Sequence, residues 1–132
     1  MLAIVALVST LLLPVLGDVG ALRVDAAARR LAETVRLARD GAILGGTPAV
    51  VVIDLDRGRW RVGPEERGAL PPGVLFRAVR SAGEPPVHAG VARLDLDPAG
   101  DPLEARVDLA DGRGRTASVV IPRGAGRVTV PR

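Results

Sequence analysis

The chain has 132 residues, which is enough for one modest domain and excludes two full ones. It has one Trp, one Phe, no Tyr and no Cys, so Val, Leu, Ile and Ala must form the core, and disulfides, thiolate metal sites and a cysteine nucleophile are excluded. All 18 basic residues are Arg, interleaved with 15 acids to a net charge of +3, which is typical of a solvated mixed surface.

The first predicted element is an apolar helix over residues 1–17. Residues 1–16 carry no charge and as a helix would span about 24 Å, slightly less than the roughly 30 Å of a membrane hydrocarbon core. A signal peptide would begin with basic residues, but the first basic residue here is Arg23. A core helix that is apolar on all faces would need a larger protein around it. We therefore expect a transmembrane or filament-core helix, with the natural start of the chain lying upstream in a basic leader. The residues expected to make membrane and assembly contacts are Leu2, Ile4, Val5, Leu7, Leu11, Leu12 and Pro14.

Residues 18–46 are predicted to continue as an amphipathic stem helix. Apolar side chains recur there at steps of four and three, which places them on one helix face, while the charged residues fall on the other faces. Gly45 and Gly46 favour a helix end, and Pro48 lies just beyond. The residues expected to pack the stem against the rest of the protein are Val24, Ala28, Leu31, Val35 and Ala38.

Residues 47–132 are predicted to form a β-rich head. Short runs with hairpin turns between them indicate strands near 49–56, 59–62, 74–80, 87–97, 103–110, 116–122 and 127–130, with a polar loop over 63–73. The expected fold class is α+β and pilin-like: a long N-terminal helix, apolar anchor plus amphipathic stem, packed on antiparallel β-sheets of six or seven short strands.

No residue pattern indicates catalysis. The single histidine, His88, has no second histidine or cysteine to share a metal, and no serine lies in a nucleophile elbow. Asp95, Asp97 and Asp101 surround a turn that resembles a calcium loop, but it lacks the ligand spacing and the terminal Glu of an EF-hand, and strand alternation explains the first two adequately. We therefore expect no enzyme activity, no metal and no cofactor.

The C-terminal region is the one basic stretch. From Arg113 onward there are arginines and no Asp or Glu, and these arginines could contact DNA phosphates or could simply form an Arg-rich turn. A patch without aromatic side chains would bind only the nucleic-acid backbone, with strong salt dependence. The residues concerned are Arg113, Arg115, Arg123 and Arg127.

Several segments carry a family resemblance in a consistent order. They are residues 1–14, residues 31–60 with the landmarks Ala38, Arg39, Pro48, Gly58 and Trp60, and the later runs 70–74, 94–102 and 126–130. Together they resemble the minor pseudopilins of type II secretion, most closely the H type, and its relative FimT among the minor type IV pilins. The leader, cleavage glycine and mature-helix glutamate of that family are not in this sequence.

The resemblance implies a structural subunit that assembles through its N-terminal helix into a type II secretion pseudopilus or a type IV pilus. It also implies a single-pass anchor in the bacterial inner membrane, a periplasmic head, other pilin subunits as partners, and cleavage and methylation by the prepilin peptidase upstream of Met1. Two alternatives stay open: a DNA-binding minor pilin for DNA uptake, and a secreted β-protein with a signal peptide.

Overall fold

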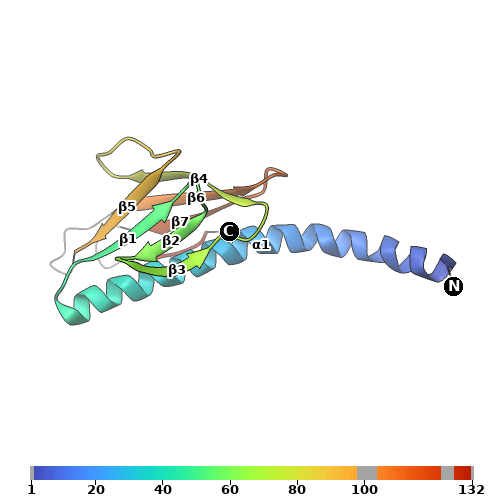
Figure 1. Ribbon diagram of the computed structural model, residues 1–132, viewed down its shortest axis with the longest axis horizontal. Helices are drawn as coiled ribbons and strands as arrows, with labels where there is room; N and C mark the ends of the chain where they lie inside the picture. The colour runs from blue at the N-terminus through green and yellow to red at the C-terminus, as the bar shows by residue number, and fades with distance from the viewer. Residues whose placement is uncertain (1, 98–103, 123–126, 132) are drawn as a thin grey trace.

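The described part of the chain folds into one long N-terminal helix and seven short strands (Figure 1). The computed structural model describes residues 2–97, 104–122 and 127–131, with side chains from Leu22 onward. Every strand pairing among these residues is antiparallel, which confirms the predicted pilin-like α+β class. The elements are α1 Leu2–Gly45, β1 Ala49–Asp54, β2 Arg59–Val62, β3 Glu65–Ala69, β4 Val74–Ser81, β5 Val91–Leu96, β6 Ala105–Asp111 and β7 Thr116–Ile121.

The helix α1 lies along the strands with only its second half. Its first half extends beyond the sheets, so the N-terminus lies far from the β-rich part of the molecule (Figure 1). The helix ends where Gly46 adopts a left-handed φ of 62°, which a residue with a Cβ would enter at a cost. The Thr47 amide then donates to the Ala42 carbonyl at 3.2 Å and closes the last turn.

The first sheet has the order β3-β2-β1-β5, with β1 in the middle. The hairpin between β1 and β2 closes through Gly58, whose positive φ of 65° lets its amide donate to the Asp54 carbonyl at 2.9 Å. On β5 the side chains alternate as predicted, with Ala92, Leu94 and Leu96 buried between exposed neighbours.

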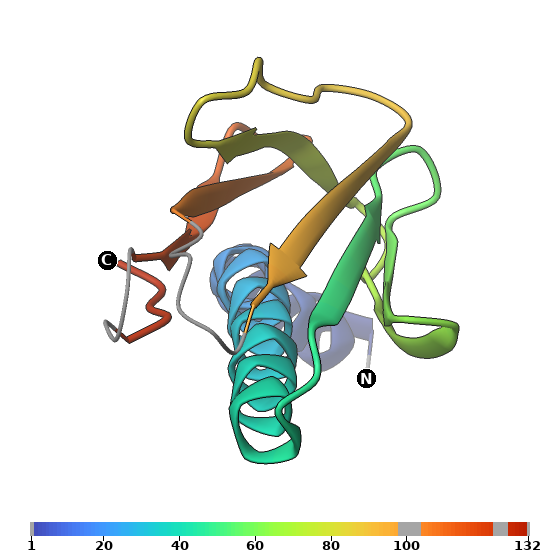
Figure 2. The same ribbon diagram turned by 90° about the vertical axis from the view of Figure 1, so that its left-hand side faces the viewer.

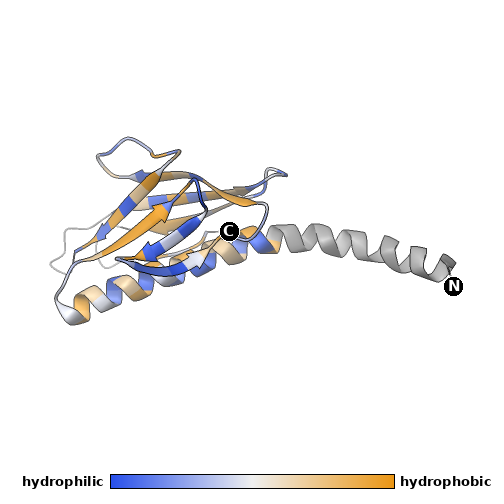
Figure 3. Cartoon of the chain, viewed as in Figure 1, coloured by the Kyte–Doolittle hydropathy of each residue, from blue (hydrophilic) through white to orange (hydrophobic). Residues whose placement is uncertain are grey.

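The second sheet has the order β4-β6-β7, and its central strand buries Val107 and Leu109. Viewed along the helix, the two sheets arch over α1, which runs beneath both of them (Figure 2). Buried apolar side chains from α1 and from both sheets form one core between the three layers. Figure 3 shows hydrophobic residues along the strands and along the part of α1 beside them.

Two strand predictions were wrong. The expected polar loop contains β3, which pairs with β2 because Gly68 lies opposite Trp60 and leaves room for the indole ring. The expected last strand is reduced to one bridge between Val120 and Thr129. Both errors lie at the edges of the sheets, where pairing depends on contacts with distant residues rather than on local hydrophobic alternation.

Candidate functional site

The stem half of α1 joins the helix to the head. Four of the residues predicted to pack it are at most 1% exposed, and the fifth is partly buried against the same core. They are Val24, Ala28, Leu31, Val35 and Ala38. Because this face touches strands of both sheets, the orientation of the head on the helix is fixed by packing.

The apolar segment continues the same helix without a break in its backbone, through Pro14 as well. The side chains expected to make membrane and assembly contacts lie outside the described residues. They are Leu2, Ile4, Val5, Leu7, Leu11, Leu12 and Pro14. In the part of the chain that the structure describes, no helix is both long enough and apolar enough to cross a membrane.

A groove of about 540 Å³ runs between the last turns of α1 and the first sheet. Its helix wall includes Leu37 and Gly41, and its sheet wall includes Val62 and Arg67. Three large apolar side chains are exposed on these last turns: Leu37 is 62% exposed, Ile43 58% and Leu44 89%. Exposed apolar side chains gathered in this way are typical of a surface that contacts another protein.

The predicted basic patch is divided in the structure. Arg113 and Arg115 lie in the turn between β6 and β7, where their amides donate to Asp111 Oδ1 at 2.8 and 3.0 Å. Arg127 follows β7 and therefore lies at its other end, about 20 Å away along the strand. Arg123 lies outside the described residues. The described arginines of this set thus form no single surface.

Asp111 organises the turn that holds Arg113 and Arg115. Desolvation raises the pKa of its carboxyl, but the two backbone hydrogen bonds and the charges of both arginines outweigh this effect and leave the pKa lowered. The Arg115 guanidinium approaches Asp111 Oδ2 at 3.8 Å. These contacts explain Arg113 and Arg115 as structural residues of a charged turn.

The other polar candidates are also separated. His88 precedes β5, is exposed, and places Nδ1 3.4 Å from the Arg77 carbonyl oxygen. Asp95 lies 4.0 Å from Arg93 on the exposed face of β5, and Asp101 lies outside the described residues. Among the described residues, no group of three or more His, Cys, Asp or Glu side chains could hold a metal ion.

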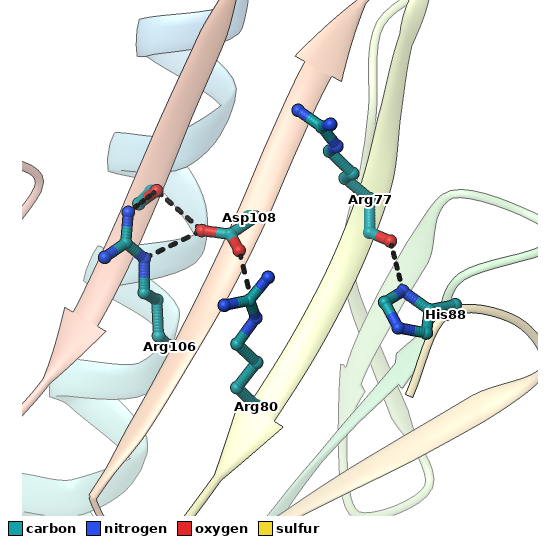
Figure 4. A network of polar contacts seen from close by, with 6 residues as sticks. Arg77, Arg80, His88, Arg106 and Asp108 are labelled. Carbon is teal, nitrogen blue, oxygen red and sulfur yellow. Dashed lines mark hydrogen bonds and ion pairs between the residues drawn. The ribbon is translucent and has the colours of Figure 1, made fainter. Parts of the chain in front are cut away.

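The second sheet carries a polar network that sequence reasoning missed. Asp108 Oδ1 accepts hydrogen bonds from Ser118 Oγ at 2.7 Å and from Arg106 Nε at 2.9 Å, and Arg80 lies 3.6 Å from Oδ2 (Figure 4). Partial burial opposes ionisation of Asp108, but these hydrogen bonds and the charges of both arginines lower its pKa. The alternation of Arg106 and Asp108 with buried neighbours was the one local signal of this network.

The comparisons with known proteins agree with this arrangement of helix and head. Residues 27–126 match the family described as type II transport protein GspH, over more than half of the chain. No curated protein and no solved structure gives a significant match. The matched region begins on the stem half of α1 and includes all seven strands. The chain therefore belongs to the GspH family, the H-type minor pseudopilins of type II secretion.

Proposed function

We propose that this pseudopilin assembles through its N-terminal helix into the periplasmic pseudopilus of a type II secretion system. The observation that carries the proposal is the single helix from Leu2 to Gly45, of which only the stem half packs on the head (Figure 1). The remaining half is uncharged over residues 1–16, and an apolar helix of this kind requires lipid or other apolar helices around it.

The proposal includes the place of the protein and its partners. The helix is inserted in the inner membrane before assembly, and the head faces the periplasm. The partners are other pseudopilin subunits, together with the prepilin peptidase for a chain with a longer start. The exposed leucines beside the groove support contacts between the head and other subunits, because the fold itself leaves them uncovered.

Single-cysteine cross-linking tests this proposal, since the chain has no cysteine of its own. The Leu7→Cys variant is expressed with the other subunits of its secretion system, each carrying one cysteine in its own helix. We expect disulfide adducts from Leu7→Cys under oxidation and none from Arg113→Cys, which places the thiol in the β6–β7 turn. If Leu7→Cys gave no more adduct than Arg113→Cys, assembly through the helix would be refuted.

A further inference from the structure

Two arginines face each other across neighbouring strands of the second sheet. Arg80 on β4 is the register partner of Arg106 on β6, and their side chains are 60% and 56% exposed. Arg106 lies on the face turned away from the core, because Ala105 and Val107 on either side of it are buried. Arg80 is exposed opposite it and lies on the same face. Like charges placed directly opposite each other repel and destabilise a sheet, so some other group must offset the repulsion between these two arginines.

A single carboxylate holds both guanidinium groups (Figure 4). Arg106 donates from Nε to Asp108 Oδ1 at 2.9 Å and from Nη2 to Ser118 Oγ at 3.1 Å, which fixes its orientation. Arg80 approaches Asp108 Oδ2 at 3.6 Å, too far for a hydrogen bond. The charge of one carboxylate is thus shared between two cations, and Arg80 has no other hydrogen-bond or ion-pair partner among the residues that the structure describes.

Arg77 extends this basic surface along β4. It is exposed, and in Figure 4 no contact is drawn to its guanidinium, which lies apart from Asp108. Its guanidinium has neither an ion pair nor a hydrogen bond among the residues that the structure describes. The surface formed by Arg77, Arg80 and Arg106, called the basic face below, therefore has three positive charges, and Asp108 is the one carboxylate paired with them among the described residues.

We infer that the basic face docks an acidic segment of a neighbouring protein subunit. Carboxylates complement its excess charge, and guanidinium groups already held in place lose less conformational freedom on binding than free ones. Leu75, 52% exposed on the same strand, offers an apolar contact beside the charges. The partner segment would therefore carry Asp or Glu residues next to an apolar side chain. The inference rests on the proposed function, which supplies neighbouring subunits.

A nucleic acid fits this face less well. Single strands bind by stacking bases on aromatic rings, and the two aromatic side chains of this chain, Trp60 and Phe76, are only 2% and 4% exposed. They lie in the core and face one another edge to face at 6.2 Å. A single-stranded oligonucleotide is therefore included in the test as the competing ligand.

Fluorescence anisotropy of a labelled peptide, Glu-Glu-Leu-Glu-Glu, tests the basic face on the full chain in detergent. We expect Arg80→Gln/Arg106→Gln to weaken binding about tenfold, and the uncharged peptide Gln-Gln-Leu-Gln-Gln to bind neither protein. The matched control is Arg59→Gln/Arg61→Gln, which removes the same charge from exposed positions on β2 and should change binding by less than about twofold. Equal losses of peptide affinity in both double variants would overturn the inference. It would also be overturned if the oligonucleotide bound more tightly than the peptide and Arg80→Gln/Arg106→Gln abolished that binding.

Arg77→Gln covers the case in which the double variant does not fold, since the Arg77 guanidinium makes no ion pair or hydrogen bond with the described residues, and its contact with His88 is through the backbone carbonyl. We expect about threefold weaker peptide binding with unchanged thermal unfolding, and unchanged binding would count against the basic face. In the assembled system, a photo-cross-linker at Leu75 should form an adduct with an Asp- or Glu-rich peptide of another subunit. Absence of this adduct while Leu7→Cys still cross-links would overturn the inference and leave the proposed function standing.

Discussion

The indole Nε1 of Trp60 donates a hydrogen bond of 3.1 Å to Thr34 Oγ1, and this contact joins β2 to α1. The Thr34 hydroxyl in turn donates to the Arg30 carbonyl at 3.1 Å, so it serves as acceptor and donor at once. Trp60 is 2% exposed, which leaves its N–H little access to water. One threonine on the stem thus satisfies the polar atom of the largest side chain in the core.

Replacing Thr34 by Val should destabilise the protein by about 1–3 kcal/mol, because the buried indole N–H would lose its acceptor. Urea unfolding of the full chain in detergent measures the change. The control is Thr47→Val, since the Thr47 hydroxyl is exposed and donates only to the Gly45 carbonyl. Its effect should stay within about 0.5 kcal/mol, and equal effects of the two variants would contradict the role of Thr34.

Gly68→Ala should disturb the packing of the single tryptophan. A Cβ at Gly68 would collide with the Trp60 ring across the β2–β3 pair, and relief requires movement of the ring or of β3. We expect a loss of about 1–3 kcal/mol in unfolding free energy and a shifted fluorescence maximum. Gly112→Ala is the control, because a Cβ there meets no atom within 4 Å. Unaltered fluorescence in Gly68→Ala would show that the contact is not tight.

Leu31 and Leu37 on α1 allow the effect of a buried leucine on stability to be compared with that of an exposed one. Leu31→Ala should cost about 2–5 kcal/mol of stability, because Leu31 is fully buried between the helix and the sheets. Leu37→Ala should change stability by less than about 0.5 kcal/mol, since Leu37 is 62% exposed. Thermal unfolding of both variants in the same detergent gives the comparison. Similar shifts for the two would mean that the stem is not seated as described.

Gly41→Ala should stabilise the chain by about 1 kcal/mol, because alanine favours a helix interior and its Cβ would meet no atom within 4 Å. Gly46→Ala should do the opposite. A Cβ at Gly46 is equally free of neighbours, but its φ of 62° lies in the left-handed region. The two melting temperatures should therefore move in opposite directions, and movement in the same direction would argue against the helix end at Gly46.

Asp108 should make stability depend on acid pH. Its pKa in the folded protein is lowered, so its stabilising contribution is complete above the unfolded-state value of about 3.9 and is lost as the pH falls through the folded value. The difference in unfolding free energy between wild type and Asp108→Asn should be constant above about pH 5 and shrink below about pH 4. Asp95→Asn, on an exposed 4.0 Å ion pair, should show almost no difference at either pH.

The stem and most strands could be predicted because their signals are local. The apolar positions from Val24 to Val35 follow helical spacing, and β5 alternates strictly, so burial on one face leaves a readable pattern. β3 has no such pattern, since its polar sequence pairs only because Gly68 admits the Trp60 ring.

The candidate site was less predictable for the same reason. The network around Asp108 joins Arg80 to Ser118, and three strands bring together residues that are 38 positions apart. The C-terminal arginines showed the reverse error. Neighbours in sequence were expected to act together, but the length of β7 separates Arg115 from Arg127. Charge clusters on a sheet depend on strand register, which the order of residues along the chain does not reveal.

The uninterrupted helix has a mechanical consequence. From Leu2 to Gly45 it is about 65 Å long, and the side chains around Leu31 hold the head on its second half. Because stem side chains pack against strands of both sheets, the head must move together with the stem half of the helix. If a helix of this length tilts as a rigid rod by about 5° at its N-terminal end, its far end moves by about 6 Å, so a small tilt of the helix displaces the head.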